Sequence, residues 1–330
     1  MSTSDPTPLP RPLPPFKSVR YAGPADGPRL IVTAAVHGNE VCGTHAIQRV
    51  MAELDAGTLA IAAGSVTFVP ITNPKAYVLE RRAGDRNLNR ALQPTDTPRE
   101  FEDLVANWLC PLLAAHDVLL DLHSFQSGGR VFVMVGPLDN AGPVEPFAHA
   151  AREEALVRCL GVDRAVDGWL STYAAGVERR IAAARAEGRS GTLDLHPRYG
   201  VGTTEYMRSQ GGWSLTLECG QHTDPQAREV AYRAIRNTLA HLGLVREPAP
   251  PVVAPIESLS LVEVIDKAHA DDAFAREWKS FDALAAGELI GTRADGTAMH
   301  APFDGRIVFP NAKAEARQEW YYLARPSTRF

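Results

Sequence analysis

A histidine and a glutamate stand where an apolar segment ends near the N-terminus. His37 follows the run LIVTAAV at residues 30–36, and Glu40 comes three positions later. At a tight strand-to-helix turn, an imidazole nitrogen and a carboxylate oxygen at this spacing can reach one metal ion. The same spacing also arises by chance, and a glutamate in the first turn of a helix interacts favourably with the helix dipole. The pair alone therefore leaves both interpretations open.

A second apolar segment, VLLDLH at residues 118–123, ends with Asp121 and His123. Side chains two positions apart on a strand face the same side, so these two groups are expected to lie next to each other. A carboxylate beside an imidazole is the usual support for a metal-bound histidine. The alternative is a histidine at a strand end that is hydrogen-bonded to the backbone.

A third apolar segment, SLTLE at residues 214–218, ends with Glu218. A carboxylate in such a position is expected to be paired or catalytic, because burying an unpaired charge is costly. Two histidines and one carboxylate with an open fourth position form a hydrolytic zinc site, and the remaining glutamate supplies the proton-transfer group. The three segment ends together predict a metal-dependent hydrolase.

The segment ERRAGDRNLNRAL, residues 80–92, contains four arginines and two asparagines around a glycine. A solvated charged loop is one interpretation of this composition. Beside the other three segments it indicates an anion site, because the arginine fork matches a carboxylate in two parallel hydrogen bonds and an asparagine fixes the orientation.

These residues must be positioned by the elements between them. Short apolar runs rich in Val, Ile and Leu predict strands, and the longer amphipathic segments predict helices. The alternation is typical of an α/β fold with a mixed, largely parallel sheet flanked by helices, in which ligands collect at the carboxyl ends of the strands. The predicted strands are 30–36, 65–71, 118–123, 131–136 and 214–218, and the predicted helices are 40–54, 98–115, 143–160, 170–187 and 224–242.

Proline-rich segments divide the chain. We expect an extended arm outside the fold at residues 1–16, a catalytic domain at 17–245, a stiff linker at 246–255 and a small, mainly β domain at 256–330. The tail has short strand-like segments and a hairpin signal at Asp295 and Gly296.

Composition excludes several classes of partner. The chain has 330 residues, 45% of them hydrophobic, and a formal net charge of −5, without a basic block that would follow a phosphate backbone or an acidic membrane. No apolar window reaches the length of a membrane span, and the N-terminus lacks the pattern of a signal peptide, so we expect a cytoplasmic protein that binds neither nucleic acid nor membrane. The scattered cysteines Cys42, Cys110, Cys159 and Cys219 are expected to stay reduced.

The motifs HGNE, GDRNLNR, DLHS and ECGQH, in this order, resemble those of the succinylglutamate desuccinylase and aspartoacylase family, relatives of the zinc carboxypeptidases. The resemblance spans residues 30–222. It implies a carboxypeptidase-like fold with one Zn²⁺ per chain, bound by His37, Glu40 and His123. It also implies that Glu218 is the general base and acid.

The same resemblance assigns the arginines and an asparagine. It implies that Asn89 and Arg90 hold a substrate carboxylate and that Arg82 polarises the scissile carbonyl. Arg208, ten residues before Glu218, stands where members acting on acidic acyl groups have a further arginine.

Four other residues have less defined roles. The family's small C-terminal β domain can contribute a tyrosine to the site, but Tyr321 and Tyr322 lie in the strand-like EWYYLA and are expected to pack in the core or on the surface. His222 either lines the pocket or bonds to backbone, and His196 is expected in a loop, with a structural role or one near the substrate.

The predicted activity is hydrolysis of the amide bond of a small N-acyl amino acid by metal-activated water. A zinc carboxypeptidase acting on peptides is the main alternative, since it shares every residue named. A nucleophilic mechanism through Cys219 or Ser124 is disfavoured because neither lies in a G-x-S-x-G turn or has a clear relay. A binding module without turnover is disfavoured by the presence of Glu218. The sequence leaves the oligomeric state open, a homo-oligomer included.

Overall fold

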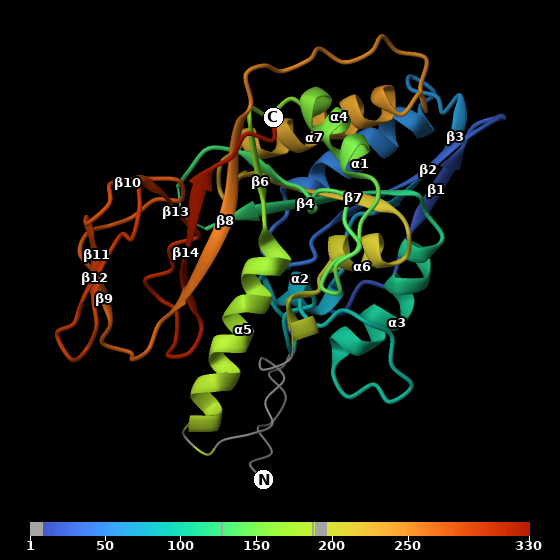
Figure 1. The fold of residues 1–330 in the computed structure, drawn as a ribbon. Helices are drawn as coiled ribbons and strands as arrows, with labels where there is room; N and C mark the ends of the chain where they lie inside the picture. The colour runs from blue at the N-terminus through green and yellow to red at the C-terminus, as the bar shows by residue number, and fades with distance from the viewer. Residues whose placement is uncertain (1–8, 127, 187, 189–196) are drawn as a thin grey trace.

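A single twisted sheet runs through the whole molecule (Figure 1). The computed structural model describes residues 9–126, 128–186, 188 and 197–330. The sheet has eleven strands in the order β1-β3-β2-β4-β7-β5-β6-β8-β14-β13-β10. Their bounds are β1 Val19–Ala22, β2 Ala25–Ala34, β3 Ala63–Val69, β4 Val118–Phe125, β5 Phe132–Met134, β6 Arg164–Asp167, β7 Trp213–Gln221, β8 Glu257–Asp266, β10 Ala283–Leu284, β13 Gly305–Val308 and β14 Glu319–Pro326.

The centre of the sheet is parallel. Strands β3, β2, β4 and β7 run in the same direction side by side, whereas β5 runs antiparallel to β7. All eight residues of β4 are buried, which explains why this strand reads as a continuous apolar run instead of an alternating one. The carboxyl ends of β2, β4 and β7 therefore meet at one edge of the sheet, and this edge carries the site.

Helices cover both faces of the sheet (Figure 1). On one face α1 (Cys42–Asp55), α4 (Ala150–Leu160) and α7 (Gln226–His241) bury their apolar sides. In α1 the buried Ala46, Ile47 and Val50 follow the helical period, so one stripe of the helix faces the sheet. On the other face α3 (Phe101–Ala114) and α6 (Thr203–Ser209) enclose a second cluster around Leu109.

The remaining helical segments are α2 (Pro74–Leu79), α5 (Trp169–Ala186) and a short 3₁₀ helix at Pro197–Gly200. Each of the predicted strands and helices listed above has a counterpart, so the α/β prediction is confirmed. The sequence patterns did not find α2, α6, β1, β6 or β8. All five are ten residues or shorter, and β1 also lies at an edge of the sheet; short elements and edge strands give little pattern signal.

The C-terminal residues continue the main sheet. After the segment 246–255, which contains no helix or strand, β8 pairs in parallel with β6, and β14, β13 and β10 follow in antiparallel order. A separate three-stranded sheet consists of β9 (Ala273–Phe274), β11 (Leu289–Thr292) and β12 (Ala298–His300). The hairpin predicted at Asp295 and Gly296 joins β11 to β12. The β domain expected at 256–330 is thus hydrogen-bonded to the catalytic part through one shared sheet.

The N-terminal arm ends in contact with the core. Residues 9–16 contain no helix or strand, as expected. The expectation that the whole arm lies outside the fold is wrong, however, because the ring of Phe16 stacks on Trp108 of α3 with centroids 5.2 Å apart. No helix among the described residues has the length and apolar character needed to cross a membrane.

Candidate metal centre and its pocket

His37 and Glu40 lie in a turn between β2 and α1. The turn is closed by a hydrogen bond from the Glu40 backbone N–H to the His37 carbonyl, 3.1 Å long. The prediction that Glu40 belongs to the first helical turn is wrong, because α1 begins at Cys42. A Cβ on Gly38 would lie 1.9 Å from the carbonyl carbon of Ala76, so only glycine lets the turn approach α2 this closely.

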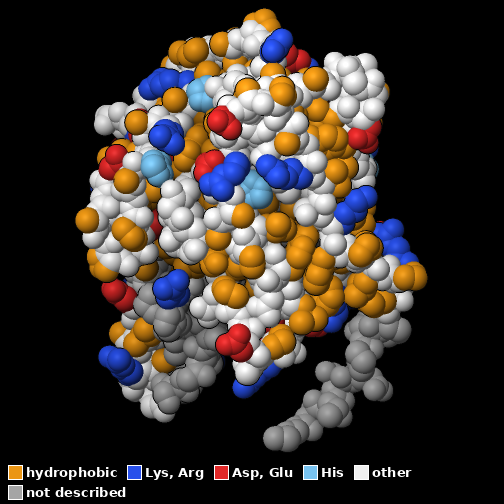
Figure 2. Space-filling model, turned by 90° about the vertical axis from the view of Figure 1, so that its right-hand side faces the viewer, with side chains coloured by type: hydrophobic (Ala, Val, Ile, Leu, Met, Phe, Trp, Pro, Cys, Tyr) orange, Lys and Arg blue, Asp and Glu red, His pale blue; other side chains and the backbone are white. Residues whose placement is uncertain are grey.

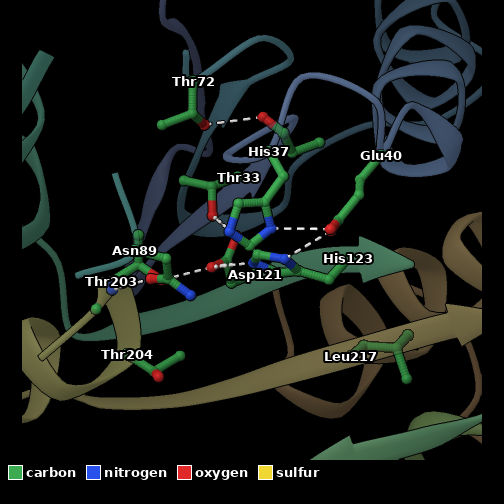
Figure 3. Close-up of polar contacts among 12 residues, drawn as sticks. Thr33, His37, Glu40, Thr72, Asn89, Asp121, His123, Thr203, Thr204 and Leu217 are labelled. Carbon is green, nitrogen blue, oxygen red and sulfur yellow. Dashed lines mark hydrogen bonds and ion pairs between the residues drawn. The ribbon is translucent and has the colours of Figure 1, made fainter. Parts of the chain in front are cut away.

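Three side chains meet at the edge of the sheet (Figure 3). The Nδ1 atom of His37 lies 2.9 Å from one carboxylate oxygen of Glu40, and the Nδ1 atom of His123 lies 2.8 Å from the other. One ligand atom from each residue lies within 4.8 Å of those of the other two, and all three residues are buried. The structure thus brings together the three residues that the sequence predicted as ligands.

The opposite edge of each imidazole has a fixed oxygen partner. The Nε2 atom of His37 lies 3.0 Å from Oδ1 of Asn87, and Nε2 of His123 lies 2.8 Å from Oδ2 of Asp121. Asp121 also accepts hydrogen bonds from the hydroxyls of Thr33 and Thr203 (Figure 3). The sequence predicted that Asp121 and His123 share a side of the strand, and this contact confirms it.

These outer contacts test whether a metal fits. An Nε2–H that donates to an outer oxygen leaves the lone pair of Nδ1 directed inward, and both Nδ1 atoms face the Glu40 carboxylate. With this tautomer, two lone pairs and a carboxylate converge on one point, an arrangement that suits a bound cation. Two neutral imidazoles and one carboxylate are also a usual ligand set for Zn²⁺ at sites that keep an open position. The residues present therefore fit a metal ion.

Glu218 reaches the same edge from β7, where it pairs in register with His123. Its carboxylate is buried, and its Oε2 atom has no hydrogen-bond partner among the described residues. Burial, together with repulsion from Glu40, raises the pKa of Glu218 to about 8. A carboxyl group in this environment can accept and return a proton near neutral pH.

A buried carboxylate holds the arginine-rich loop in place. Glu102 of α3 accepts hydrogen bonds from the backbone N–H groups of Gly84, Asp85 and Arg86 at 2.9, 3.1 and 3.2 Å. It also accepts one from the side chain of Asn73, 2.8 Å away. The loop before Arg90 is therefore fixed to the fold, and it is not simply a solvated charged segment.

The three predicted residues of this loop point to the site in different ways. Arg82 lies over the ligands, with NH1 3.2 Å from Oε1 of Glu40. The side-chain oxygen of Asn89 accepts from the Thr203 backbone N–H at 2.8 Å. The guanidinium of Arg90 lies 5.0 Å from the ring centre of Trp169 and donates to the Asn89 carbonyl, but it forms no ion pair with a described carboxylate.

Arg208 on α6 has a different environment. Its Nε and NH1 atoms each lie 2.9 Å from a carboxylate oxygen, of Glu153 and Glu145 respectively, and its NH2 donates to the Ser214 carbonyl at 3.0 Å. A third carboxylate, of Glu205, lies 3.6 Å from NH1. The family resemblance placed Arg208 among the substrate-binding residues, and the structure supplies carboxylates from the chain itself.

All eight residues predicted for the site line one cavity of about 550 Å³. Figure 2 shows one face of the molecule, on which basic, acidic and histidine side chains gather near the middle. Side chains of the same three kinds line the cavity. The predicted residues that line the cavity are His37, Glu40, Arg82, Asn89, Arg90, His123, Arg208 and Glu218.

Several lining residues were not assigned from the sequence. Tyr322 of β14 was expected only to pack; its ring does contact Trp169, but it also lines the cavity and its buried hydroxyl has no partner among the described residues. Trp169 and Glu319 line the cavity as well. No local motif marks these residues: Glu319 and Tyr322 lie on β14, which joins the rest of the main sheet through β8, and Trp169 begins α5.

Ser124 has a histidine partner that the sequence did not reveal. Its Oγ lies 2.9 Å from Nδ1 of His222, whose Nε2 faces the Asn39 side chain and not a carboxylate. His222 lines the cavity, as one of the two interpretations expected. Cys219 is buried, and burial raises the pKa of its thiol well above the usual value. His196 lies outside the described residues.

Comparisons with known proteins agree with this architecture. The model of the succinylglutamate desuccinylase/aspartoacylase catalytic domain matches residues 26–241. The N-alpha-acetyl-L-2,4-diaminobutyric acid deacetylase of Halomonas elongata is 32% identical over 114 residues, which make up 33% of this chain and 31% of that protein. The aligned region thus spans about a third of the curated relative.

Solved structures share the fold over nearly the whole chain. A succinylglutamate desuccinylase/aspartoacylase from Rhodobacter sphaeroides has a TM-score of 0.69 at 19% identity, covering 94% of this chain and 90% of that one. The product-bound ectoine utilization protein EutE (DoeB) from Ruegeria pomeroyi has a TM-score of 0.67 at 17% identity, covering 98% and 100%.

Proposed function

The chain belongs to the succinylglutamate desuccinylase/aspartoacylase family, and from this premise we propose that it is a zinc-dependent hydrolase of a small N-acyl amino acid. Family membership supports hydrolytic deacylation as the reaction class. The metal, the substrate type and the roles of individual residues belong to the proposal.

One observation carries the proposal. The unpartnered carboxylate of Glu218 opens into the same cavity as the buried group of His37, Glu40 and His123. Leaving a buried carboxylate unpaired costs stability, so its presence beside a metal-binding group is best explained by proton transfer.

The proposed reaction is cleavage of an amide by water. His37, Glu40 and His123 would hold zinc, which when bound acts as a Lewis acid toward water and the scissile carbonyl. Glu218 takes one proton from the attacking water, whose oxygen forms the new bond to the carbonyl carbon. Glu218 then returns that proton to the nitrogen as the C–N bond breaks. The products are a carboxylic acid and a free amine, and no acyl group becomes attached to the protein.

The arginines would act at two positions around this reaction. Arg82 lies above the ligand group and would stabilise the negative charge that develops on the carbonyl oxygen. Arg90, which has no carboxylate partner among the described residues, would bind the substrate carboxylate, with the Asn89 side chain beside it.

The shape of the cavity favours small substrates over peptides. Its volume of about 550 Å³ suits a small molecule. Segments from the C-terminal part of the chain supply part of its wall, including Trp278, Phe309 and Lys313. A cavity of this volume, walled by both parts of the chain, supports a small substrate over the peptide substrate of the zinc carboxypeptidase alternative.

The contact between Ser124 and His222 gives a nucleophilic mechanism its best support. His222 has no carboxylate partner of its own, whereas a serine nucleophile is normally activated by a histidine that an acid orients. Replacing Ser124 by Ala separates the mechanisms. Water attack predicts that the variant keeps most of its activity, and loss of activity with full zinc content would instead support the nucleophile.

The proposal is tested by metal analysis followed by a substrate panel. Purified protein should contain one zinc per chain, and the His123→Ala variant should lose it. Chelation should abolish amine release from N-acyl amino acids, and zinc should restore it. Faster release from C-terminal peptides than from any small N-acyl amino acid would favour the carboxypeptidase, and activity that survives chelation would refute metal dependence.

A further inference from the structure

Three arginines line the cavity: Arg82 pairs with Glu40, and the other two, Arg90 and Arg208, differ in whether a carboxylate of the chain already pairs with them. Arg90 donates to a backbone carbonyl and lies against Trp169, without an ion pair to any described carboxylate. Arg208 contacts three glutamates, and its NH2 is used by a backbone carbonyl. The two guanidinium groups thus have opposite surroundings within one pocket.

Two of the carboxylates around Arg208 are built into the fold. Glu153 of α4 accepts from the backbone N–H groups of Gly136 and Ser214 as well as from Arg208. Glu205 accepts from the Gly202 backbone N–H at the start of α6, 2.8 Å away. Because Glu153 and Glu205 have fixed backbone partners, a ligand cannot simply displace these two acids and take their place on Arg208, whereas the Glu145 carboxylate is held by Arg208 alone among the described residues.

The balance of charge at this end of the cavity is negative. Three carboxylates surround a single guanidinium, and one of them, Glu205, lines the cavity together with Arg208. A further carboxylate placed here would meet Glu205 with no free positive partner, and like charges at short range in a buried site repel strongly. An uncharged polar group would meet the hydroxyls of Thr204 and Thr216 instead, which also line the cavity.

We infer that the Arg208 end of the pocket excludes a second carboxylate, so that the substrate is an N-acyl amino acid with a single carboxylate, bound at Arg90. This inference rests on the proposed function and narrows it. An uncharged acyl group or side chain fits the Arg208 end, whereas a succinyl group, or an aspartate or glutamate side chain, does not.

Isosteric substrate pairs test the inference. N-acetyl-L-glutamine and N-acetyl-L-glutamate differ only in the second charge on the amino acid, and N-succinamoyl-L-alanine and N-succinyl-L-alanine differ only in the charge on the acyl group. We expect kcat/KM to be at least tenfold lower for the charged member of one pair or of both. An effect in the glutamine/glutamate pair means that the amino-acid side chain faces Arg208, and an effect in the other pair means that the acyl group does. Equal or higher kcat/KM for both charged members would overturn the inference.

A double variant tests the cause of this selectivity. Glu145→Gln with Glu205→Gln keeps side-chain size and hydrogen-bond acceptors but leaves Arg208 with a single carboxylate. The ratio of kcat/KM for the charged member to that for the uncharged member should rise at least tenfold. The matched control, Glu229→Gln with Glu247→Gln, removes two charges that pair with Arg49 and Arg236 elsewhere, and should leave the ratio unchanged.

Folding and activity are followed separately. If the double variant loses zinc or its cooperative melting, Glu145→Gln alone gives the same comparison. If no substrate is hydrolysed, the proposed function fails, and the inference is still tested by calorimetric binding of both compound pairs to zinc-loaded Glu218→Gln protein. Tighter binding of the uncharged member of one pair or of both supports the inference, and equal or weaker binding of both uncharged members refutes it.

Discussion

The Oδ2 atom of Asp121 lies 2.8 Å from Nε2 of His123, on the edge of the ring opposite the one that faces Glu40. The same carboxylate accepts hydrogen bonds from Thr33 on β2 and Thr203 on α6. One fully buried side chain therefore joins His123, a proposed metal ligand, to β2 and α6. The orientation of His123 depends on this carboxylate and not on its own rotamer preference alone.

Replacing Asp121 by Asn should weaken zinc binding. The amide keeps the size of the side chain but removes the negative charge and turns an NH₂ group toward the two threonine hydroxyls or the imidazole. Loss of such a supporting contact typically lowers metal affinity by about 10- to 100-fold. Competition with a chelator measures the zinc dissociation constant. Asp117→Asn, at an exposed ion pair with Arg29, is the matched control, and equal affinities for the two variants would contradict the role of Asp121.

Arg90→Ala should impair hydrolysis only of substrates with a free carboxylate. Losing a charge-assisted contact should cost about 1.5 to 3 kcal/mol in transition-state stabilisation, which is measured as kcat/KM. The loss should be much smaller when the same carboxylate is amidated. Arg81→Ala, at an exposed position in the same loop, serves as control. If Arg90→Ala lowers kcat/KM equally for both substrate forms, Arg90 does not bind the carboxylate.

The stability of the fold should depend on pH through Glu145. Burial, opposed by Arg208 and aided by Glu205 and Glu153, raises the pKa of Glu145 to about 7 from a usual value of 4.5. Between these values the folded state binds the proton and the unfolded state does not, so this group's contribution to stability falls as pH rises from about 4.5 to about 7 and is constant above that.

Glu145→Gln should remove this dependence. We subtract the free energy of unfolding of the natural protein from that of the variant. This difference should be roughly 2 to 3 kcal/mol larger at pH 8 than at pH 5. Urea unfolding at the two pH values measures it, and other titrating groups cancel in the comparison. A difference that is the same at both pH values would show that Glu145 is ionised in the folded protein throughout this range.

The positions of the proposed metal ligands and of Glu218 could be predicted because strand periodicity and strand order bring them to one edge of the sheet. The alternation of a strand puts Asp121 and His123 on one side, and parallel strands deliver His37, His123 and Glu218 to the same edge of the sheet. Both relationships follow from the order of the elements along the chain, so they can be predicted from a single sequence.

The surroundings of those residues could not be predicted in the same way. Two partners of Arg208 come from α4 and from the loop that contains Glu145. Each of them is about sixty residues from Arg208 in the sequence. Tyr322 reaches the cavity because β14 joins the main sheet through β8. Such contacts depend on tertiary packing, which leaves no spacing pattern in the sequence.

The arginine-rich loop shows the same division. Its composition predicted an anion site, and Arg82, Asn89 and Arg90 line the cavity; the binding of an anion there stays a prediction. What fixes the loop is Glu102, which looks like an ordinary acidic residue in the first turn of a helix. The pattern that reveals a functional group does not reveal the residue that holds it in position.

Zinc content and turnover of Glu218→Gln, measured on one preparation, test the central claim most directly. Glutamine keeps the size and hydrogen-bonding capacity of the side chain but cannot accept the proton from water. The account predicts that the variant retains its zinc and its melting temperature, while kcat falls by about two to four orders of magnitude and KM changes little. Near-native turnover, or a loss of zinc in step with activity, would contradict it.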